Sequence, residues 1–160
     1  MKKTENTYSL PALALMVFLI WTYPKGFPAD QNYLFIEQYF DIEWLKNILS
    51  HIEFSYAGQL ISVTSLGYPQ FIQFILIKFY DFVMFLLLSF LWCRCLQIRS
   101  RSDGMTALLS FVITMGLAVL MVLYAGWKSG SQVPFQTEDL ILKSYGALTG
   151  IIMARWAERK

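Results

Sequence analysis

The 160-residue sequence has few charged residues, two cysteines and one histidine. Charged residues make up 15% of the chain, against about 25% in a typical soluble domain, whereas 56% of the residues are hydrophobic. In water such a chain could not cover its apolar surface, so lipid must be the solvent for much of it. We therefore expect an all-α membrane protein.

The cysteines and the histidine are too few to build a metal centre. Cys93 and Cys95 flank one arginine, and this C-x-C pair with His51 cannot supply the four ligands of a structural zinc site. We expect reduced thiols on the cytoplasmic side, with a disulfide or a lipid attachment as the alternatives. No metal and no cofactor are expected.

Motifs of common enzymes are missing as well. The sequence has no glycine-rich phosphate loop, no G-x-S-x-G elbow and no H-E-x-x-H pair. Catalysis would have to use Asp, Lys, Tyr or Ser, and the sequence leaves open whether the protein is an enzyme. With a net charge of only +2, we expect no nucleic-acid partner.

Four apolar runs predict transmembrane helices. They cover residues 9–23, 71–93, 105–125 and 139–156. At a rise of ~1.5 Å per residue, the second run makes a helix of about 34 Å, enough to cross a hydrocarbon core about 30 Å thick. The first run follows two lysines and could be a signal peptide, but bulky residues follow it and we expect an uncleaved span.

The sizeable region outside the hydrocarbon is residues 24–70. Its aromatic-rich part, residues 33–49, has the apolar spacing of an amphipathic helix that lies in the interface. Residues 52–64 favour strands on both sides of Gly58, which can adopt a positive φ, so we expect a short β-hairpin. Residues 1–160 then form one polytopic membrane domain.

The placement of lysine and arginine predicts the topology. Basic residues gather before the first run, between the second and third runs, and after the fourth. The positive-inside rule assigns these segments to the cytoplasm. We expect four spans in the lipid bilayer, both termini in the cytoplasm, and residues 24–70 outside.

Charged residues inside the predicted spans are the candidate site. Lys78 and Asp81 lie one turn apart in the second span, and Asp139 and Lys143 lie one turn apart at the start of the fourth. A charge in the membrane is costly without a partner. If the two helices are neighbours, Lys78 can meet Asp139 and Asp81 can meet Lys143. Tyr80 could hydrogen-bond into the same layer.

Each charged residue also has a structural interpretation. Asp139 can cap the start of its helix, and Lys143 can extend its amine to the lipid headgroups. Asp81 can serve in a purely structural ion pair. An aspartate side chain is too short to reach the membrane surface, so Asp81 is the strongest candidate for a working site.

Small residues in the fourth run predict close helix packing. Gly146, Gly150 and Ala154 recur every four residues, a spacing that lets two helices approach closely. We expect internal packing, with dimerisation as the alternative. Gly116 and Thr114 in the third run are the expected facing surface.

Short stretches from about residue 50 onward resemble the VanZ-like membrane proteins of bacteria. The stretches are YAGQLISV at residues 56–63, FI at 71–72 leading to Lys78, and DL at 139–140 followed by Gly146, Ala147 and Gly150. Two motifs of that family are replaced here. Where such proteins carry a basic residue and a histidine in the second span, this chain has IKFYD at 77–81. Where they carry an acid, a glutamine and a Pro-Gly-Arg run, this chain has GSQVPFQ at 130–136.

The resemblance implies a multi-pass protein of the bacterial plasma membrane and cell envelope. Some members of that family are linked to reduced susceptibility to glycopeptide antibiotics. Any chemistry that depends on the two replaced motifs would be altered in this chain. We expect a protein that binds or acts on a lipid-linked or glycopeptide-like ligand at an outward-facing polar site.

Two alternatives remain open. The chain could be a non-catalytic subunit that joins a membrane-protein partner in a larger complex. It could also be a small transporter or channel subunit. Transport ranks lower because the third run offers few polar residues, namely Thr106, Ser110 and Thr114.

Overall fold

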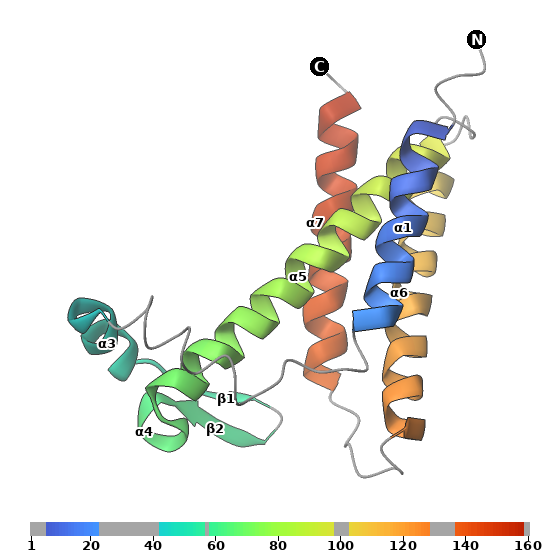
Figure 1. Ribbon diagram of the computed structural model, residues 1–160. Helices are drawn as coiled ribbons and strands as arrows, with labels where there is room; N and C mark the ends of the chain where they lie inside the picture. Colours follow the sequence, from blue (N-terminus) through green and yellow to red (C-terminus); the bar gives the residue numbers. More distant parts are fainter. Residues whose placement is uncertain (1–5, 23–41, 57, 98–102, 129–136, 159–160) are drawn as a thin grey trace. The chain divides into compact units, whose positions relative to one another are not determined.

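The computed structural model describes residues 6–22, 42–56, 58–97, 103–128 and 137–158 (Figure 1). In chain order the elements are α1 (Asn6–Thr22), α3 (Glu43–Ser50), β1 (Glu53–Tyr56), β2 (Gln59–Ser62), α4 (Val63–Leu66), α5 (Tyr68–Gln97), α6 (Asp103–Lys128) and α7 (Thr137–Glu158). The described chain is therefore mostly helical, with one two-stranded sheet.

The chain divides into two compact units, and the boundary falls inside α5. One unit, here the helical unit, comprises Met1–Pro24 and Asp81–Lys160. The other, here the hairpin unit, comprises Lys25–Tyr80. The single membrane domain expected over residues 1–160 stays a prediction.

Each of the four predicted spans overlaps a helix. The helices α5, α6 and α7 extend past the predicted bounds at both ends, whereas α1 begins earlier than predicted and its described part ends at Thr22. Two segments, Tyr68–Gln97 and Gly104–Tyr124, are long and apolar enough to cross a membrane, and the apolar part of α1, Tyr8–Trp21, is shorter. Only 22% and 33%, respectively, of the most apolar stretches of these two segments is buried, whereas the core helix of a soluble protein is mostly buried. Their exposed apolar surface favours a lipid environment.

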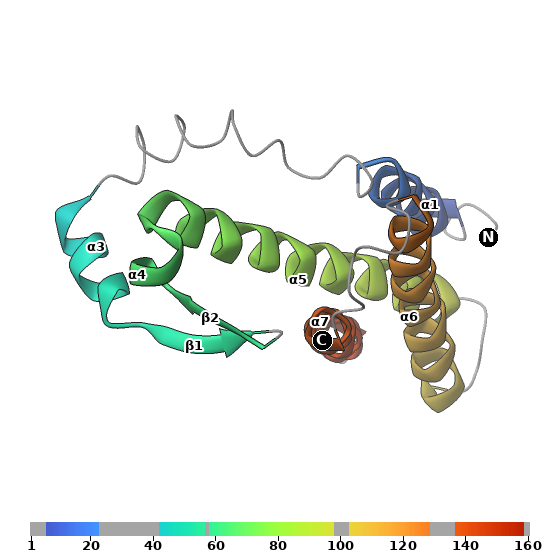
Figure 2. The same ribbon diagram turned by 90° about the horizontal axis from the view of Figure 1, so that it is seen from below.

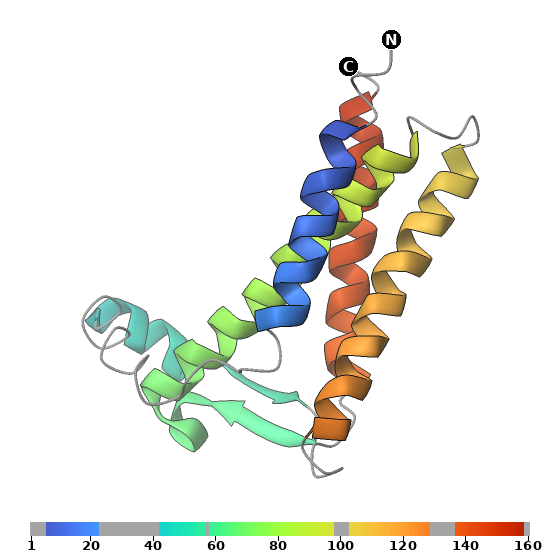
Figure 3. The ribbon, with the colours of Figure 1, turned by 45° about the vertical axis from the view of Figure 1, so that its right-hand side comes forward.

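The helices of the helical unit alternate in direction. Figures 1 and 3 show that the start of α1, the end of α5, the start of α6 and the end of α7 lie at one end of this unit. The contact between Tyr8 and Arg94 agrees with this arrangement, because the Arg94 guanidinium lies 5.7 Å from the Tyr8 ring centroid. The first turns of α1 thus meet the last turn of α5.

The core of the helical unit lies where α5, α6 and α7 meet. Cys93, Ile151 and Ala154 are buried together, and Phe90, Ala107 and Phe111 pack against them. Ala154 is fully buried in this cluster, so the small residue in α7 faces the inside of the unit.

The hairpin unit contains the predicted β-hairpin. β1 and β2 pair antiparallel, with Glu53 opposite Ser62 and Tyr56 opposite Gln59. Gly58 in the turn has φ 75°, a left-handed conformation that glycine adopts without steric cost. The prediction of a hairpin turning at Gly58 is confirmed.

The chain passes from the hairpin into α5 through a short capped helix. The Ser62 hydroxyl accepts from the Ser65 backbone N–H at 3.1 Å, and the Ser65 hydroxyl accepts from the Ser62 N–H at 3.0 Å, which forms a capping box for α4. Gly67, with φ 86°, ends α4, and α5 begins at the next residue. Figure 2 shows α3, the hairpin, α4 and the start of α5.

Within the described residues, the expected amphipathic helix corresponds to α3. This helix starts after Ile42 and has no buried residue within its described length. Residues 33–41 of the predicted range lie outside the described residues.

Candidate functional site

Asp81 and Lys143 form an ion pair between α5 and α7. Lys143 Nζ lies 3.7 Å from Asp81 Oδ2. The Lys143 side chain is fully buried, and the Asp81 side chain is 14% exposed. Asp81 lies near the middle of α5, and Lys143 lies in the second turn of α7. The expected meeting of these two residues is therefore present.

The burial of Lys143 rules out one structural interpretation. Its Nζ is 5.5 Å from the Phe85 ring centroid, so an aromatic face covers one side of the ammonium. A lysine that extended to the lipid headgroups would be exposed at its amine, whereas Lys143 is 0% exposed. The alternative in which Lys143 extends its amine outward is therefore wrong, and the amine lies inside beside Asp81.

Two glycines of α7 allow α5 to come close enough for this pair. A Cβ added at Gly146 would lie 2.6 Å from the Phe82 carbonyl oxygen, and one at Gly150 would overlap the Leu86 carbonyl oxygen. The facing surface is thus the backbone of α5 (Figure 1). Among the described atoms, nothing lies within 4 Å of a Cβ built at Gly116, so the expected role of Gly116 as the facing surface is wrong.

The contacts also give the relative direction of α5 and α7. Asp81 contacts Lys143, and further along both helices Cys93 packs with Ala154. The residue numbers of these contacts increase together along α5 and α7, so the two helices run parallel. A parallel pair can place an acid one turn from a base on each helix in the same layer.

Buried hydroxyls connect the three long helices beside the ion pair. The Ser89 hydroxyl donates to the Ala147 carbonyl at 2.7 Å, and the Ser110 hydroxyl donates to the Ser89 carbonyl at 2.9 Å. Thr114 donates to the Ser110 carbonyl within α6 at 2.8 Å. Ser89 is the residue that sequence reasoning missed. The available signal was a small polar residue about two turns after Asp81 in an otherwise apolar run.

The other candidates lie at further positions on α5 and α7. In the hairpin unit, Lys78 Nζ lies 4.9 Å from the Tyr56 ring centroid and 5.4 Å from that of Phe74. Tyr80 is half-buried on α5. Asp139 lies in the first turn of α7, where negative charge is favourable. A Lys78–Asp139 pair would join the two units and stays a prediction.

The cysteines and acidic residues form no metal centre in the part of the chain that the structure describes. No group of three or more His, Cys, Asp or Glu is close enough there to hold an ion. Cys93 is buried, Cys95 is half-buried, and neither is in a disulfide. What the site at Asp81 offers is a carboxylate held beside a buried ammonium, on a side chain that is partly exposed.

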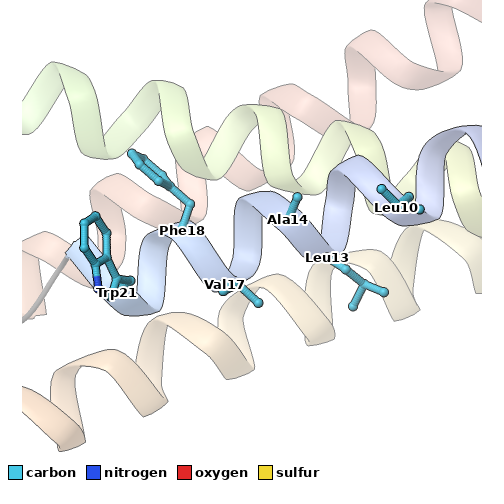
Figure 4. Close-up of a pocket in the computed structure, with 6 residues that line it drawn as sticks. All are labelled: Leu10, Leu13, Ala14, Val17, Phe18 and Trp21. Carbon is cyan, nitrogen blue, oxygen red and sulfur yellow. The ribbon is translucent and has the colours of Figure 1, made fainter.

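A shallow apolar depression lies on α1 and shares no residue with the ion pair. Six residues line it, Leu10, Leu13, Ala14, Val17, Phe18 and Trp21 (Figure 4). Their spacing of three and four residues places them along one side of the helix. Val17 and Trp21 are 65% and 62% exposed, so this surface meets lipid or another membrane helix if α1 spans the bilayer.

Comparison with protein-family models, with curated proteins and with solved structures gives no match for this chain. The resemblance to VanZ-like proteins therefore stays a prediction from the short stretches of sequence.

Proposed function

We propose that this chain is a four-span protein of the bacterial plasma membrane, similar to VanZ-like proteins, with both termini in the cytoplasm. The alternating directions of α1, α5, α6 and α7 support the proposal, since four alternating spans return the chain to its starting side. Arg94 and Arg155, near the ends of α5 and α7, lie toward that same side. The positive-inside rule makes it the cytoplasmic side.

In this orientation the Asp81–Lys143 pair lies inside the bilayer. Asp81 is the fourteenth residue of α5, about 20 Å from its outer end at ~1.5 Å per residue. Intramembrane charges are expensive and commonly mark functional sites. The pair is the best candidate for a ligand site in the described chain.

The ligand that this site suits is lipid-linked or glycopeptide-like. The observation that carries the proposal is the unequal exposure of the two partners: Lys143 is fully buried, whereas Asp81 is 14% exposed. The ammonium lies beside one carboxylate oxygen, and the partly exposed Asp81 side chain can accept hydrogen bonds from amide, hydroxyl or ammonium groups of a ligand. The Phe85 ring against the buried Lys143 ammonium favours binding over catalysis.

The experiment expresses the chain in a glycopeptide-susceptible bacterium and measures susceptibility. Asp81→Asn and the double variant Asp81→Leu with Lys143→Met are compared with the wild type at equal protein level. Thr149→Ala is the matched control, because the Thr149 hydroxyl donates to the Tyr145 carbonyl of its own helix.

Lower susceptibility with the wild type and the control, lost in both Asp81 variants, would support the proposal. The double variant is decisive because it removes the two charges together and so leaves no unpaired charge. An unchanged effect in the double variant would show that the pair is structural, and the ligand site would have to be abandoned.

A second candidate function is that of a non-catalytic subunit, which the exposed apolar side of α1 favours (Figure 4). Ala14 at its centre would let a partner helix approach closely. Purification in mild detergent tests this candidate. A lone chain that still lowers glycopeptide susceptibility when no other protein is co-purified would argue against it.

A transport path has less support. The residues Thr106, Ser110 and Thr114 of α6 are buried, and Ser110 and Thr114 donate their hydroxyl protons to backbone carbonyls. Hydroxyls satisfied in this way hold helices together and are not free to solvate a passing ion.

A further inference from the structure

The hairpin and the start of α5 share an aromatic cluster. Phe54 and Tyr56 alternate along β1 and so lie on one face of the hairpin. The Phe54 ring centroid is 6.3 Å from that of Phe71 and 6.2 Å from that of Phe74, and the Tyr56 ring meets Phe74 edge-on at 5.2 Å. Phe71 is fully buried under this face. The hairpin is thus fixed to the first turns of α5.

Among the described residues, Lys78 is the cation that contacts this aromatic cluster. Its Nζ lies against the rings of both Tyr56 and Phe74. Phe74 is one turn nearer the start of α5, so the lysine side chain runs back toward that end of the helix. A lysine near the outer membrane surface extends its amine in this direction to reach the headgroups.

The remainder of the hairpin unit has the character of an interfacial surface. Trp44 and Ile48 lie one turn apart on α3 and are 64% and 55% exposed, and Leu60 on β2 is 58% exposed. Lys46, on the same helix, holds its Nζ 5.3 Å from the Tyr68 ring centroid. Exposed aromatic and branched side chains beside lysines are typical of protein segments at the level of lipid headgroups.

We propose that Lys78, held against the rings of Tyr56 and Phe74, binds the phosphate group of a membrane lipid or of a lipid-linked ligand. The two rings fix the amine and cover part of it with apolar surface. Its N–H groups can then donate charge-assisted hydrogen bonds to the phosphate oxygens of a headgroup that the extended side chain reaches. The site rests on the proposed function, since the orientation of α5 puts this end of the helix at the outer surface.

The test measures binding to the full chain purified in a neutral detergent. The probes are polyprenyl phosphate and phosphatidylglycerol, each compared with its counterpart that lacks phosphate, polyprenol and diacylglycerol. Native mass spectrometry gives the apparent Kd for the wild type, Lys78→Met, Lys78→Gln and Lys78→Arg. Lys46→Met is the matched control, because Lys46 also lies over an aromatic ring of the same unit.

We expect the wild type, Lys78→Arg and Lys46→Met to prefer the phosphate-bearing probe by about tenfold, and the two neutral variants to lose this preference. A preference confined to polyprenyl phosphate identifies a lipid-linked ligand, and one shared with phosphatidylglycerol identifies bulk phospholipid. The unfolding midpoint by circular dichroism shows that a neutral variant is folded.

Equal preference in the wild type and in either folded neutral variant would overturn the site. Binding in detergent depends neither on membrane orientation nor on glycopeptide susceptibility. Failure of the Lys78 site therefore leaves the Asp81 proposal standing, and a topology other than four spans would overturn the proposed function without altering this binding.

Discussion

Lys143 of α7 keeps its entire side chain inside the protein, with its amine 3.7 Å from the Asp81 carboxylate of α5. Removing one partner leaves the other charge buried and unpaired, which costs far more than removing both. We expect Asp81→Asn or Lys143→Met alone to lower the free energy of unfolding by about 3 kcal/mol. The double variant Asp81→Leu with Lys143→Met should recover most of this loss.

Thermal unfolding of the purified chain in detergent, followed by circular dichroism, measures the three variants. Additive losses in the double variant would contradict the ion pair, because two independent residues show no coupling.

The close approach of α7 to α5 predicts opposite effects on stability for two glycine substitutions. Gly150→Ala places a methyl group on the Leu86 carbonyl oxygen, so the helices must move apart at a cost of about 1–3 kcal/mol. Gly116→Ala in α6 meets no described atom within 4 Å and should stabilise its helix by up to about 1 kcal/mol. Unfolding midpoints of the two variants check this expectation. Equal effects would mean that α5 does not face Gly150.

The spacing of the charged residues predicted the pairing between α5 and α7, and the spacing of the small residues predicted that some helix packs closely against α7. An acid and a base one turn apart on each of two helices can pair only if the helices are parallel neighbours, so Asp81 and Lys143 could be matched from the sequence. The four-residue spacing of Gly146 and Gly150 shows that some backbone must come close, but every apolar helix offers such a backbone. That the partner is α5 could not be read from periodicity.

The hydrogen bonds of the hydroxyl groups are a second feature that the sequence alone does not predict. Ser89 donates to the neighbouring helix, whereas Thr149 donates to a carbonyl of its own helix four residues earlier. Both choices satisfy the donor, and the sequence around a serine or threonine does not distinguish them. The hairpin was easier to predict, because Gly58 between two β-favouring segments leaves few other conformations.

This difference between Ser89 and Thr149 predicts different losses of stability when each hydroxyl is removed. Ser89→Ala removes a 2.7 Å hydrogen bond between α5 and α7 and leaves the Ala147 carbonyl without that donor. We expect a loss of about 0.6–1.7 kcal/mol, from the average to the maximum measured for hydrogen bonds between membrane helices. Thr149→Ala removes only a bond within α7 and should change stability less. Chemical denaturation in mixed micelles measures both variants, and a larger loss for Thr149→Ala would reverse the assignment.

The membrane orientation can be tested at residues that the structure describes as exposed. Ser55 lies on β1, in the hairpin that the topology assigns to the outside, and Ala157 lies near the end of α7, assigned to the cytoplasm. In a chain whose Cys93 and Cys95 are replaced by serine, Ser55→Cys should react with a membrane-impermeant maleimide in intact cells. Ala157→Cys should react only after the membrane is permeabilised.

The two cysteine variants test the direction of α7 and the position of the hairpin separately. Labelling of Ala157→Cys in intact cells would reverse the direction of α7, and α5 would turn with it because the two helices run parallel. The outer end of α5 would then be cytoplasmic, and Lys78 would lie toward the inner leaflet. Protection of both cysteines in intact cells would instead mean that α5 does not carry the hairpin across the bilayer, and the four-span arrangement would be wrong.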